Sequence, residues 1–231
     1  MQRLRVWDLP TRLFHWLLAA AITAAGITGE IGGSIIELHG KIGLAIVGLI
    51  AFRLAWGVVG STTARFTSFV RGPAAIRSYL QGTWRGIGHN PLGALSVLGL
   101  LALIAAQVGT GLFANDDIAF QGPLSVLIDK ELSDALGELH EEIFGLLLTL
   151  IGLHLAAIVF YVRVKKHNLV KPMLTGWQDD APNEAAPPKR AGPVALVLAL
   201  AFAALAVWGA SAAWYTPPPA PPASSTSTPA W

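Results

Sequence analysis

Five long apolar segments decide what this chain can fold into. Their approximate boundaries are residues 11–29, 38–60, 92–113, 137–161 and 194–214. A run of roughly 17 to 25 apolar residues is long enough to cross the hydrocarbon core of a bilayer as a helix, where the backbone must satisfy its own hydrogen bonds. The composition agrees, because 53% of the 231 residues are hydrophobic and only 13% are charged, whereas a soluble domain has about 25% charged residues. We therefore expect an all-α integral membrane protein.

The basic residues alternate between the ends of these segments. They precede the first segment (Arg3, Arg5, Arg12), separate the second from the third (Arg65, Arg71, Arg77, Arg85) and follow the fourth (Arg163, Lys165, Lys166, Lys171). The loop between the third and fourth segments carries mostly acidic residues instead (Asp116, Asp117, Asp129, Glu131, Asp134). Because positive residues mark cytoplasmic loops, the pattern predicts a cytoplasmic N-terminus and a C-terminal tail on the external side.

The sequence predicts four regions. Residues 1–176 hold the first four segments, and residues 177–192 contain Pro182, Pro187 and Pro188 and are typical of a flexible cytoplasmic linker. Residues 193–215 form an additional C-terminal transmembrane helix. The proline-rich residues 216–231 are typical of a disordered, extended tail. We therefore expect a fifth helix appended to a core of four.

Two properties exclude whole classes of function. The chain has no cysteine, which excludes iron–sulfur clusters, thiolate zinc sites and the covalent attachment of a c-type haem. The net charge of +2 is small, and no basic run alternates with aromatic residues, so nucleic acid is not an expected partner. Any redox cofactor must therefore be held without thiols.

Four histidines lie within the apolar segments. His15 is near the cytoplasmic start of the first segment, and His39 is at the external start of the second. The fourth segment carries His140 near its external end and His154 fourteen residues later, which is a rise of about 21 Å and a rotation only about 40° short of four full turns. Both therefore leave nearly the same face of one helix at opposite depths. Matching by depth pairs His15 with His154 and His39 with His140.

Such pairs favour haem over other ligands. Ionisable groups are costly inside a membrane and need partners, and neutral imidazole is a natural axial ligand of haem iron. The alternative to haem ligation is that the four histidines are unrelated residues with packing roles. A compact metal site is not expected, because it would need three or four ligands close together. We expect two b-type haems, with His15, His39, His140 and His154 as iron ligands, and Arg12, Lys41 and Arg53 are candidate partners for haem propionates or membrane anchors. His89 and His167 are expected at the membrane interface, and contact with a haem propionate or a quinone head group is the alternative for His89.

Several motifs resemble the bacterial cytochrome b561 family, which is similar to the b-type cytochrome subunits of membrane-bound nickel–iron hydrogenases. They are VWDLPTRLFHW with His15, ELHGKIG with His39, GHNPLGALSVL at the third segment, and LHEEIFGLLLTLIGLHLAA with His140 and His154. The resemblance covers about residues 5–176. It implies a four-helix bundle with two bis-histidine haems on these four residues, and an interfacial helix within residues 66–84.

The resemblance also implies a function in electron transfer. The expected protein lies in the bacterial inner membrane and passes electrons between the quinone pool, with a quinone bound, and a periplasmic partner such as a c-type cytochrome or a hydrogenase-like oxidoreductase. Whether it is itself an enzyme stays open at this point. Two alternatives remain, a superoxide oxidase that reduces quinone and a haem-free membrane scaffold.

Overall fold

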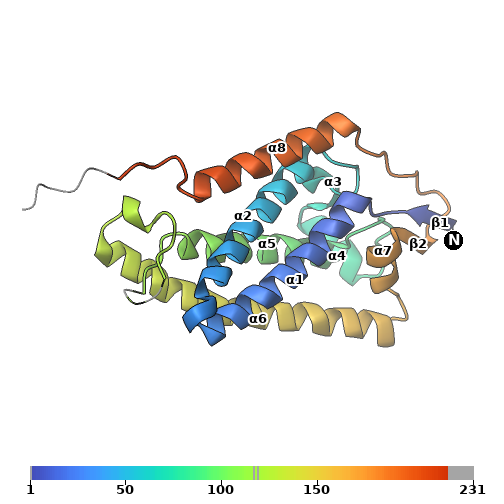
Figure 1. Cartoon of the computed structure of the whole chain (residues 1–231). Helices are drawn as coiled ribbons and strands as arrows, with labels where there is room; N and C mark the ends of the chain where they lie inside the picture. Colours follow the sequence, from blue (N-terminus) through green and yellow to red (C-terminus); the bar gives the residue numbers. More distant parts are fainter. Residues whose placement is uncertain (1, 117, 119, 218–231) are drawn as a thin grey trace, which may run out of the picture.

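The protein is an elongated bundle of helices (Figure 1). The computed structural model describes residues 2–116, 118 and 120–217. Five of its helices are long and apolar enough to cross a membrane, namely α1 (Leu9–Ile31), α2 (Ile36–Val59), α5 (Pro91–Gly111), α6 (Lys130–Arg163) and α8 (Pro193–Ala210). The predicted all-α architecture with five apolar helices is therefore confirmed. The tail beyond residue 217 lies outside the described residues.

Short polar side chains set the starts of three of these helices. Asp8 accepts a hydrogen bond from the Thr11 amide (2.7 Å) at the start of α1, and Asn90 accepts one from Gly93 (2.8 Å) at the start of α5. Asp129 caps α6 in the same way through the Leu132 amide. Each cap satisfies an amide that has no partner within its helix.

A tight turn separates α1 from α2. It begins at Gly32 and Gly33, whose φ angles are +61° and +56°, a conformation that costs glycine little and other residues more. The 3₁₀ helix η1 (Gly33–Ile35) follows and leads directly into α2. The turn therefore brings the end of α1 next to the start of α2, where His39 lies.

The helices pack in a chain of neighbours around α2. Helices α1, α5 and α8 contact α2, and α6 packs against α5. The shared core comes from all five helices and includes Phe14, Ile50, Leu101, Leu147 and Ala199. Many leucines and valines of the long helices instead face outward, as expected for side chains in contact with lipid.

The fifth helix is packed closely against the bundle. Ala199 in α8 is fully buried, and a side chain added at Gly48 of α2 would come within 2.9 Å of Val207. Small residues allow such close approach between helices in membranes. Helix α8 is therefore seated along α2.

Helix α6 is longer than the apolar segment that predicts it. It has 34 residues, about 51 Å at 1.5 Å per residue, and it begins seven residues before residue 137. Its first turns are amphipathic, so a search for continuous apolar sequence misses them, yet Ser133 is buried and donates to the Phe113 carbonyl (2.7 Å). The extension packs against the loop that follows α5.

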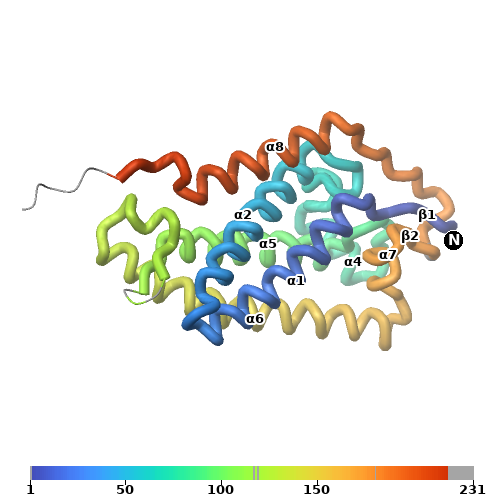
Figure 2. The backbone as a smooth tube through the Cα atoms, viewed as in Figure 1, coloured from blue at the N-terminus to red at the C-terminus, as the bar shows by residue number. Residues whose placement is uncertain are grey.

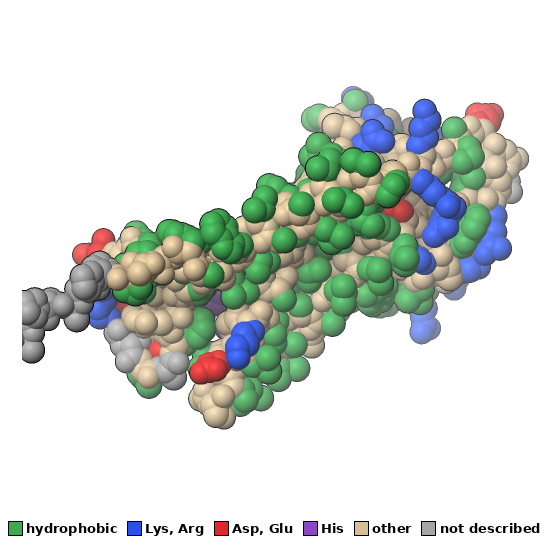
Figure 3. All heavy atoms as spheres, turned by 45° about the horizontal axis from the view of Figure 1, so that its top comes forward, with side chains coloured by type: hydrophobic (Ala, Val, Ile, Leu, Met, Phe, Trp, Pro, Cys, Tyr) green, Lys and Arg blue, Asp and Glu red, His purple; other side chains and the backbone are tan. Residues whose placement is uncertain are grey.

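One end of the bundle, which we call the basic end, is closed by short elements. They are β1 (Gln2–Arg5), α3 (Phe66–Phe69), α4 (Pro73–Leu80), α7 (Val170–Thr175) and β2 (Trp177–Ala181). The two short helices between residues 66 and 80 lie where an interfacial helix is expected. Arginine and lysine side chains gather at this end (Figure 3), whereas Asp129, Glu131 and Asp134 lie at the opposite, acidic end.

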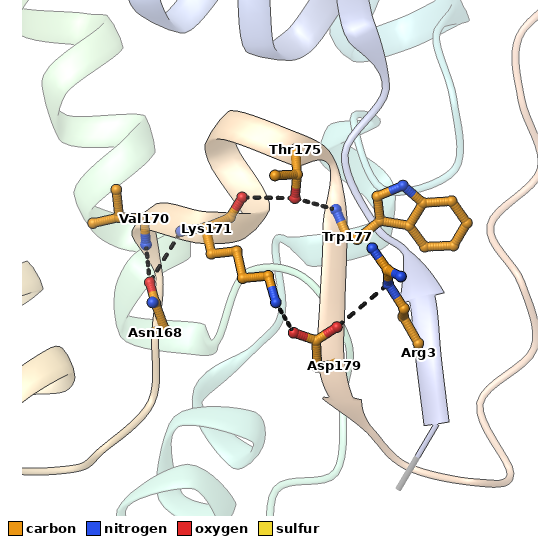
Figure 4. Close-up of polar contacts among 7 residues, drawn as sticks. All are labelled: Arg3, Asn168, Val170, Lys171, Thr175, Trp177 and Asp179. Atoms are coloured by element: carbon orange, nitrogen blue, oxygen red, sulfur yellow. Dashed lines mark hydrogen bonds and ion pairs between the residues drawn. The ribbon is translucent and has the colours of Figure 1, made fainter.

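The linker prediction needs a correction at its start. Residues 177–181 form β2, which pairs antiparallel with β1 at the N-terminus (Figure 2). The strand is held because Ala181 is fully buried and because Asp179 forms ion pairs with Arg3 (3.4 Å) and Lys171 (Figure 4). Sequence alone does not show this pairing, since the two strands are far apart along the chain.

Candidate functional site

Two of the four histidines lie beside each other at the acidic end. His39 projects from α2 and His140 from α6. Their ring centroids are 6.1 Å apart and their planes are inclined by 86°. The structure therefore brings together one of the two pairs that depth alone predicts.

Hydrogen bonds fix the orientation of both rings. Nδ1 of His39 lies 2.9 Å from the Ala25 carbonyl oxygen, and Nδ1 of His140 lies 2.8 Å from the Gln107 carbonyl oxygen. A carbonyl can only accept, so both Nδ1 atoms carry the proton and both Nε2 atoms carry the lone pair. The Gln107 side-chain amide donates to Nε2 of His140 (3.0 Å), in agreement with this assignment. Nε2 of His39 therefore keeps its lone pair available for a metal, whereas a metal at Nε2 of His140 would have to displace the Gln107 amide.

Glycines make room for these rings. A Cβ added at Gly29 would lie 3.1 Å from the His39 ring, and one at Gly111 would lie 2.7 Å from the His140 ring. Phe120 lies edge-on to His39 and fills the space above Gly40. Larger side chains at these glycines would collide with the imidazoles or with the aromatic ring beside them.

The pair lines a cavity of about 870 Å³. The lining is mostly apolar and includes Gly26, Gly43 and Phe144 besides the two histidines. Ligand and cofactor sites occupy roughly 300 to 1,000 Å³ and have mostly apolar walls with a few placed polar groups. The cavity is thus large enough for a flat macrocycle.

The ring separation fits a single metal ion between the two imidazoles. A transition metal lies about 2 Å from each nitrogen ligand, and each nitrogen is about 1 Å from its ring centre, so two opposed imidazoles would have centroids about 6 Å apart. The observed centroid distance of 6.1 Å is compatible with this spacing, and the two rings lie edge to face in the structure. The donor set, the cavity and the protonation of both Nδ1 atoms all fit a bis-histidine haem.

The other two histidines lie at the opposite depth. His15 in α1 and His154 in α6 are both half-buried and close enough to interact electrostatically. Nδ1 of His15 is fully buried and has no hydrogen-bond partner, and its ring lies edge-on to Trp16. His15 and His154 therefore lie in the same part of the bundle, while the role of all four histidines as ligands stays a prediction.

The candidate propionate partners and His89 differ in how deeply they are buried. Lys41 is exposed and forms an ion pair with Glu37 (3.8 Å), and Arg12 donates to the Leu174 carbonyl (2.6 Å). Arg53 is buried within the bundle. His89 packs between Trp7 and Phe69 at centroid distances of 4.6 Å. Arg53 therefore belongs to the interior of the basic end, and the half-buried His89 packs there between two aromatic rings.

Two functional contacts escape the sequence reasoning. Gln107 and Thr110 of α5 both contact the His140 ring. They are three residues apart and polar within an otherwise apolar segment, which places them on one helix face. That spacing is the signal that could have identified them.

A compact metal centre is not found in the described part of the chain. No group of three or more histidine, cysteine, aspartate or glutamate side chains there could hold a metal ion together. Among the described residues, the two histidine pairs are therefore the candidate metal ligands.

Comparisons with known proteins point to one family. A family model described as prokaryotic cytochrome b561 matches residues 6–176. A "Probable Ni/Fe-hydrogenase B-type cytochrome subunit" of Azotobacter chroococcum mcd 1 is 27% identical over 225 residues, which cover 77% of this chain and 90% of that protein. A "Probable Ni/Fe-hydrogenase 1 B-type cytochrome subunit" of Escherichia coli K12 is 24% identical over 137 residues, 46% of this chain and 57% of that protein. No solved structure matches the chain.

Proposed function

Because this chain belongs to the prokaryotic cytochrome b561 family, we propose that it is a di-haem b-type cytochrome that carries electrons across the bacterial inner membrane. Membership implies haem b and a multi-pass membrane protein. The protein would exchange electrons with the quinone pool at one end and with a periplasmic redox partner at the other. The relatives named as hydrogenase subunits support an oxidoreductase of that kind as the partner.

The neighbouring rings of His39 and His140 carry the proposal. Their separation of 6.1 Å, their protonated Nδ1 atoms and the cavity of about 870 Å³ fit one haem held on both faces. His15 and His154 would hold a second haem at the other depth. When bound, haem supplies a reversible one-electron carrier.

Histidines on both faces of the ring favour electron transfer over chemistry at iron. A haem held by two histidines would have no position left for dioxygen or a substrate. The Ala25 and Gln107 carbonyls hold the rings of His39 and His140 in place, and such support would make each ring a better ligand and fix its direction. The protein's own residues would therefore hold the cofactors rigidly and exclude reactants from the iron.

Helix α6 links the two sites. It carries His140 and His154 fourteen residues apart, a rise of about 21 Å. Ring edges of two macrocycles would be considerably closer than their centres. One helix would thus set the spacing of the whole electron route.

Spectroscopy of the purified protein tests this proposal. Dithionite reduction should give the sharp paired bands of six-coordinate haem b, and haem extraction should give two haems per chain. His39→Ala and His140→Ala should each leave one haem, while His167→Ala, in the basic segment after α6, should keep both. A protein without these bands would refute the cytochrome, and a wild-type content of one haem would refute the di-haem assignment.

A further inference from the structure

Buried polar atoms without partners gather at the basic end. Nine side-chain nitrogen or oxygen atoms of the described residues are buried and have no hydrogen-bond partner. Seven of them belong to residues at or near this end, namely Arg5, Thr11, Arg12, His15, Arg53, Ser61 and His89. Buried polar groups in native proteins are almost always paired, so each exception needs an explanation. Three of these seven atoms belong to arginines and can only donate, and the other four can donate or accept, so a single acceptor near them could serve several.

Arg53 is the member of this group with the greatest need of a partner. Its side chain is only 3% exposed, and Nη1 is among the unpartnered atoms. It takes part in none of the ion pairs found among the described residues. A buried charge without a partner is strongly destabilising, so an anion is expected next to it.

The position of Arg53 along α2 places it at the level of the second histidine pair. It follows His39 by fourteen residues, the same interval that separates His140 from His154 on α6. Both residues of α2 therefore leave nearly the same helix face, about 21 Å apart. Helix α2 thus presents His39 to one pair and Arg53 at the depth of the other.

The nearby carboxylate of Asp8 is already in use. Asp8 accepts from the Thr11 amide through Oδ1 (2.7 Å) and from Trp56 Nε1 through Oδ2 (3.0 Å). It affects Arg53 electrostatically, yet it is not within ion-pair distance. Asp8 therefore does not supply the direct partner.

Aromatic rings enclose the guanidinium and His89. The Arg53 guanidinium carbon lies 4.7 Å from the Phe66 ring centre and 6.0 Å from that of Phe69, and Phe69 also packs on His89. Helix α3 is pressed on α2, because a Cβ at Gly57 would overlap the Phe66 ring. The α3 segment thus covers Arg53 on one side, which favours a ligand from within the bundle over a lipid headgroup.

His89 adds a neutral polar group to this environment. Burial, followed by the nearby charge of Arg53 and by His15, lowers the pKa of His89 to about 3. The imidazole is therefore uncharged at neutral pH, and Arg53 is the charged member of the two.

We propose that Arg53, with His89 beside it, binds a propionate of the haem held between His15 and His154. This rests on the proposed function, because it requires a haem at that pair. A guanidinium binds a carboxylate through two parallel charge-assisted hydrogen bonds. Of the three cations that the sequence offers for this role, Lys41 is exposed and paired with Glu37, and Arg12 donates to a backbone carbonyl through Nη1, although its Nε has no partner. Arg53 is the only one of the three that is buried, so the assignment falls on Arg53.

The test compares Arg53→Gln with Arg77→Gln in the purified holoprotein. Arg77 is an exposed arginine of α4 at the same end, so its variant controls for general loss of positive charge. The readouts are haem content, the potential of each haem, and infrared redox-difference spectra with haem carrying ¹³C-labelled propionates. Arg53→Gln should shift the labelled carboxylate bands and lower the reduction equilibrium of one haem roughly tenfold, as expected for a unit charge removed at about 10 Å in a dielectric of about 20. Tenfold corresponds to 59 mV for one electron.

The outcomes distinguish this inference from the proposed function. If wild-type protein binds no haem, the proposed function fails. If both haems are present and Arg53→Gln leaves the propionate bands and both potentials as in Arg77→Gln, the propionate contact is refuted. A band from a bound quinone that shifts while the propionate bands stay fixed would refute it in favour of a quinone at Arg53.

A second measurement applies if Arg53→Gln does not fold. Wild-type apoprotein is reconstituted with haem dimethyl ester, which has no free propionate. One of the two haems should then bind at least tenfold more weakly than protohaem. Equal affinity of both sites for both haems would overturn the inference.

Discussion

A methyl group added at Gly111 should remove one haem without unfolding the protein. A Cβ at this residue would lie 2.7 Å from Cε1 and 3.0 Å from Nδ1 of His140. Ordinary contacts of a Cβ begin near 3.4 Å, so the ring would have to move by about 0.7 Å. That movement would strain the 2.8 Å hydrogen bond from Nδ1 to the Gln107 carbonyl, which orients the ligand.

The expected size of the effect follows from that lost orientation. Disturbing the groups that support a metal-binding histidine typically costs 10- to 100-fold in affinity, and we expect Gly111→Ala to weaken one haem site by that factor. The control is Gly109→Ala on the same helix, where an added Cβ meets nothing within 4 Å. Replacing glycine by alanine within a helix is by itself stabilising by about 1 kcal/mol, so the control should keep both haems and full stability.

Haem titration of the two apoproteins, followed by optical absorption, measures the effect. Gly111→Ala should bind its second haem with reduced affinity and show the loss in the signal assigned to the His39–His140 site. If Gly111→Ala binds both haems as tightly as Gly109→Ala, the His140 ring does not ligate iron in the position described here.

Three further predictions follow from the same geometry. His154→Ala should lose the haem of the His15–His154 pair and keep the haem that His140→Ala loses. Haem extraction and difference spectra of both variants check this. Two unchanged haems in either variant would contradict the ligand assignment. Asp8→Ala should lower the free energy of unfolding by about 1 to 3 kcal/mol, because it removes the cap of α1 and the partner of Trp56. Thermal unfolding in detergent measures the loss, with Glu184→Ala, at an exposed carboxylate, as the control. Electron transfer to a basic c-type cytochrome should slow as ionic strength rises, because Asp129, Glu131 and Glu138 lie at the acidic end; a stopped-flow rate independent of salt would exclude electrostatic docking there.

Much of the fold could be predicted because membrane helices are constrained locally. In lipid each helix must satisfy its own backbone, so length and hydropathy suffice to find it, and four of the five predicted segments agree with their helices within a few residues. Helix α6 is the exception, since its first turns before residue 137 lie outside the apolar stretch. Its start depends on Asp129 and on packing of Ser133, which hydropathy does not report.

The basic end shows what local reasoning misses. The pairing of β1 with β2 joins residues more than 170 positions apart, and no local pattern encodes such a contact. The burial of His89 between Trp7 and Phe69 likewise comes from three separate segments. An assignment of His89 to the interface from sequence could not anticipate this packing.

The sequence by itself determined the five apolar helices, the absence of thiol chemistry and the depths of the four histidines, because helical rise and hydropathy are properties of consecutive residues. The tertiary structure alone decided which ring nitrogens carry the proton, since the tautomers of His39 and His140 depend on carbonyls of Ala25 and Gln107 in other helices. It alone also shows that Arg53 is the buried one of the three candidate cations. Burial and hydrogen bonding between helices are set by packing, and packing exists only once the chain has folded.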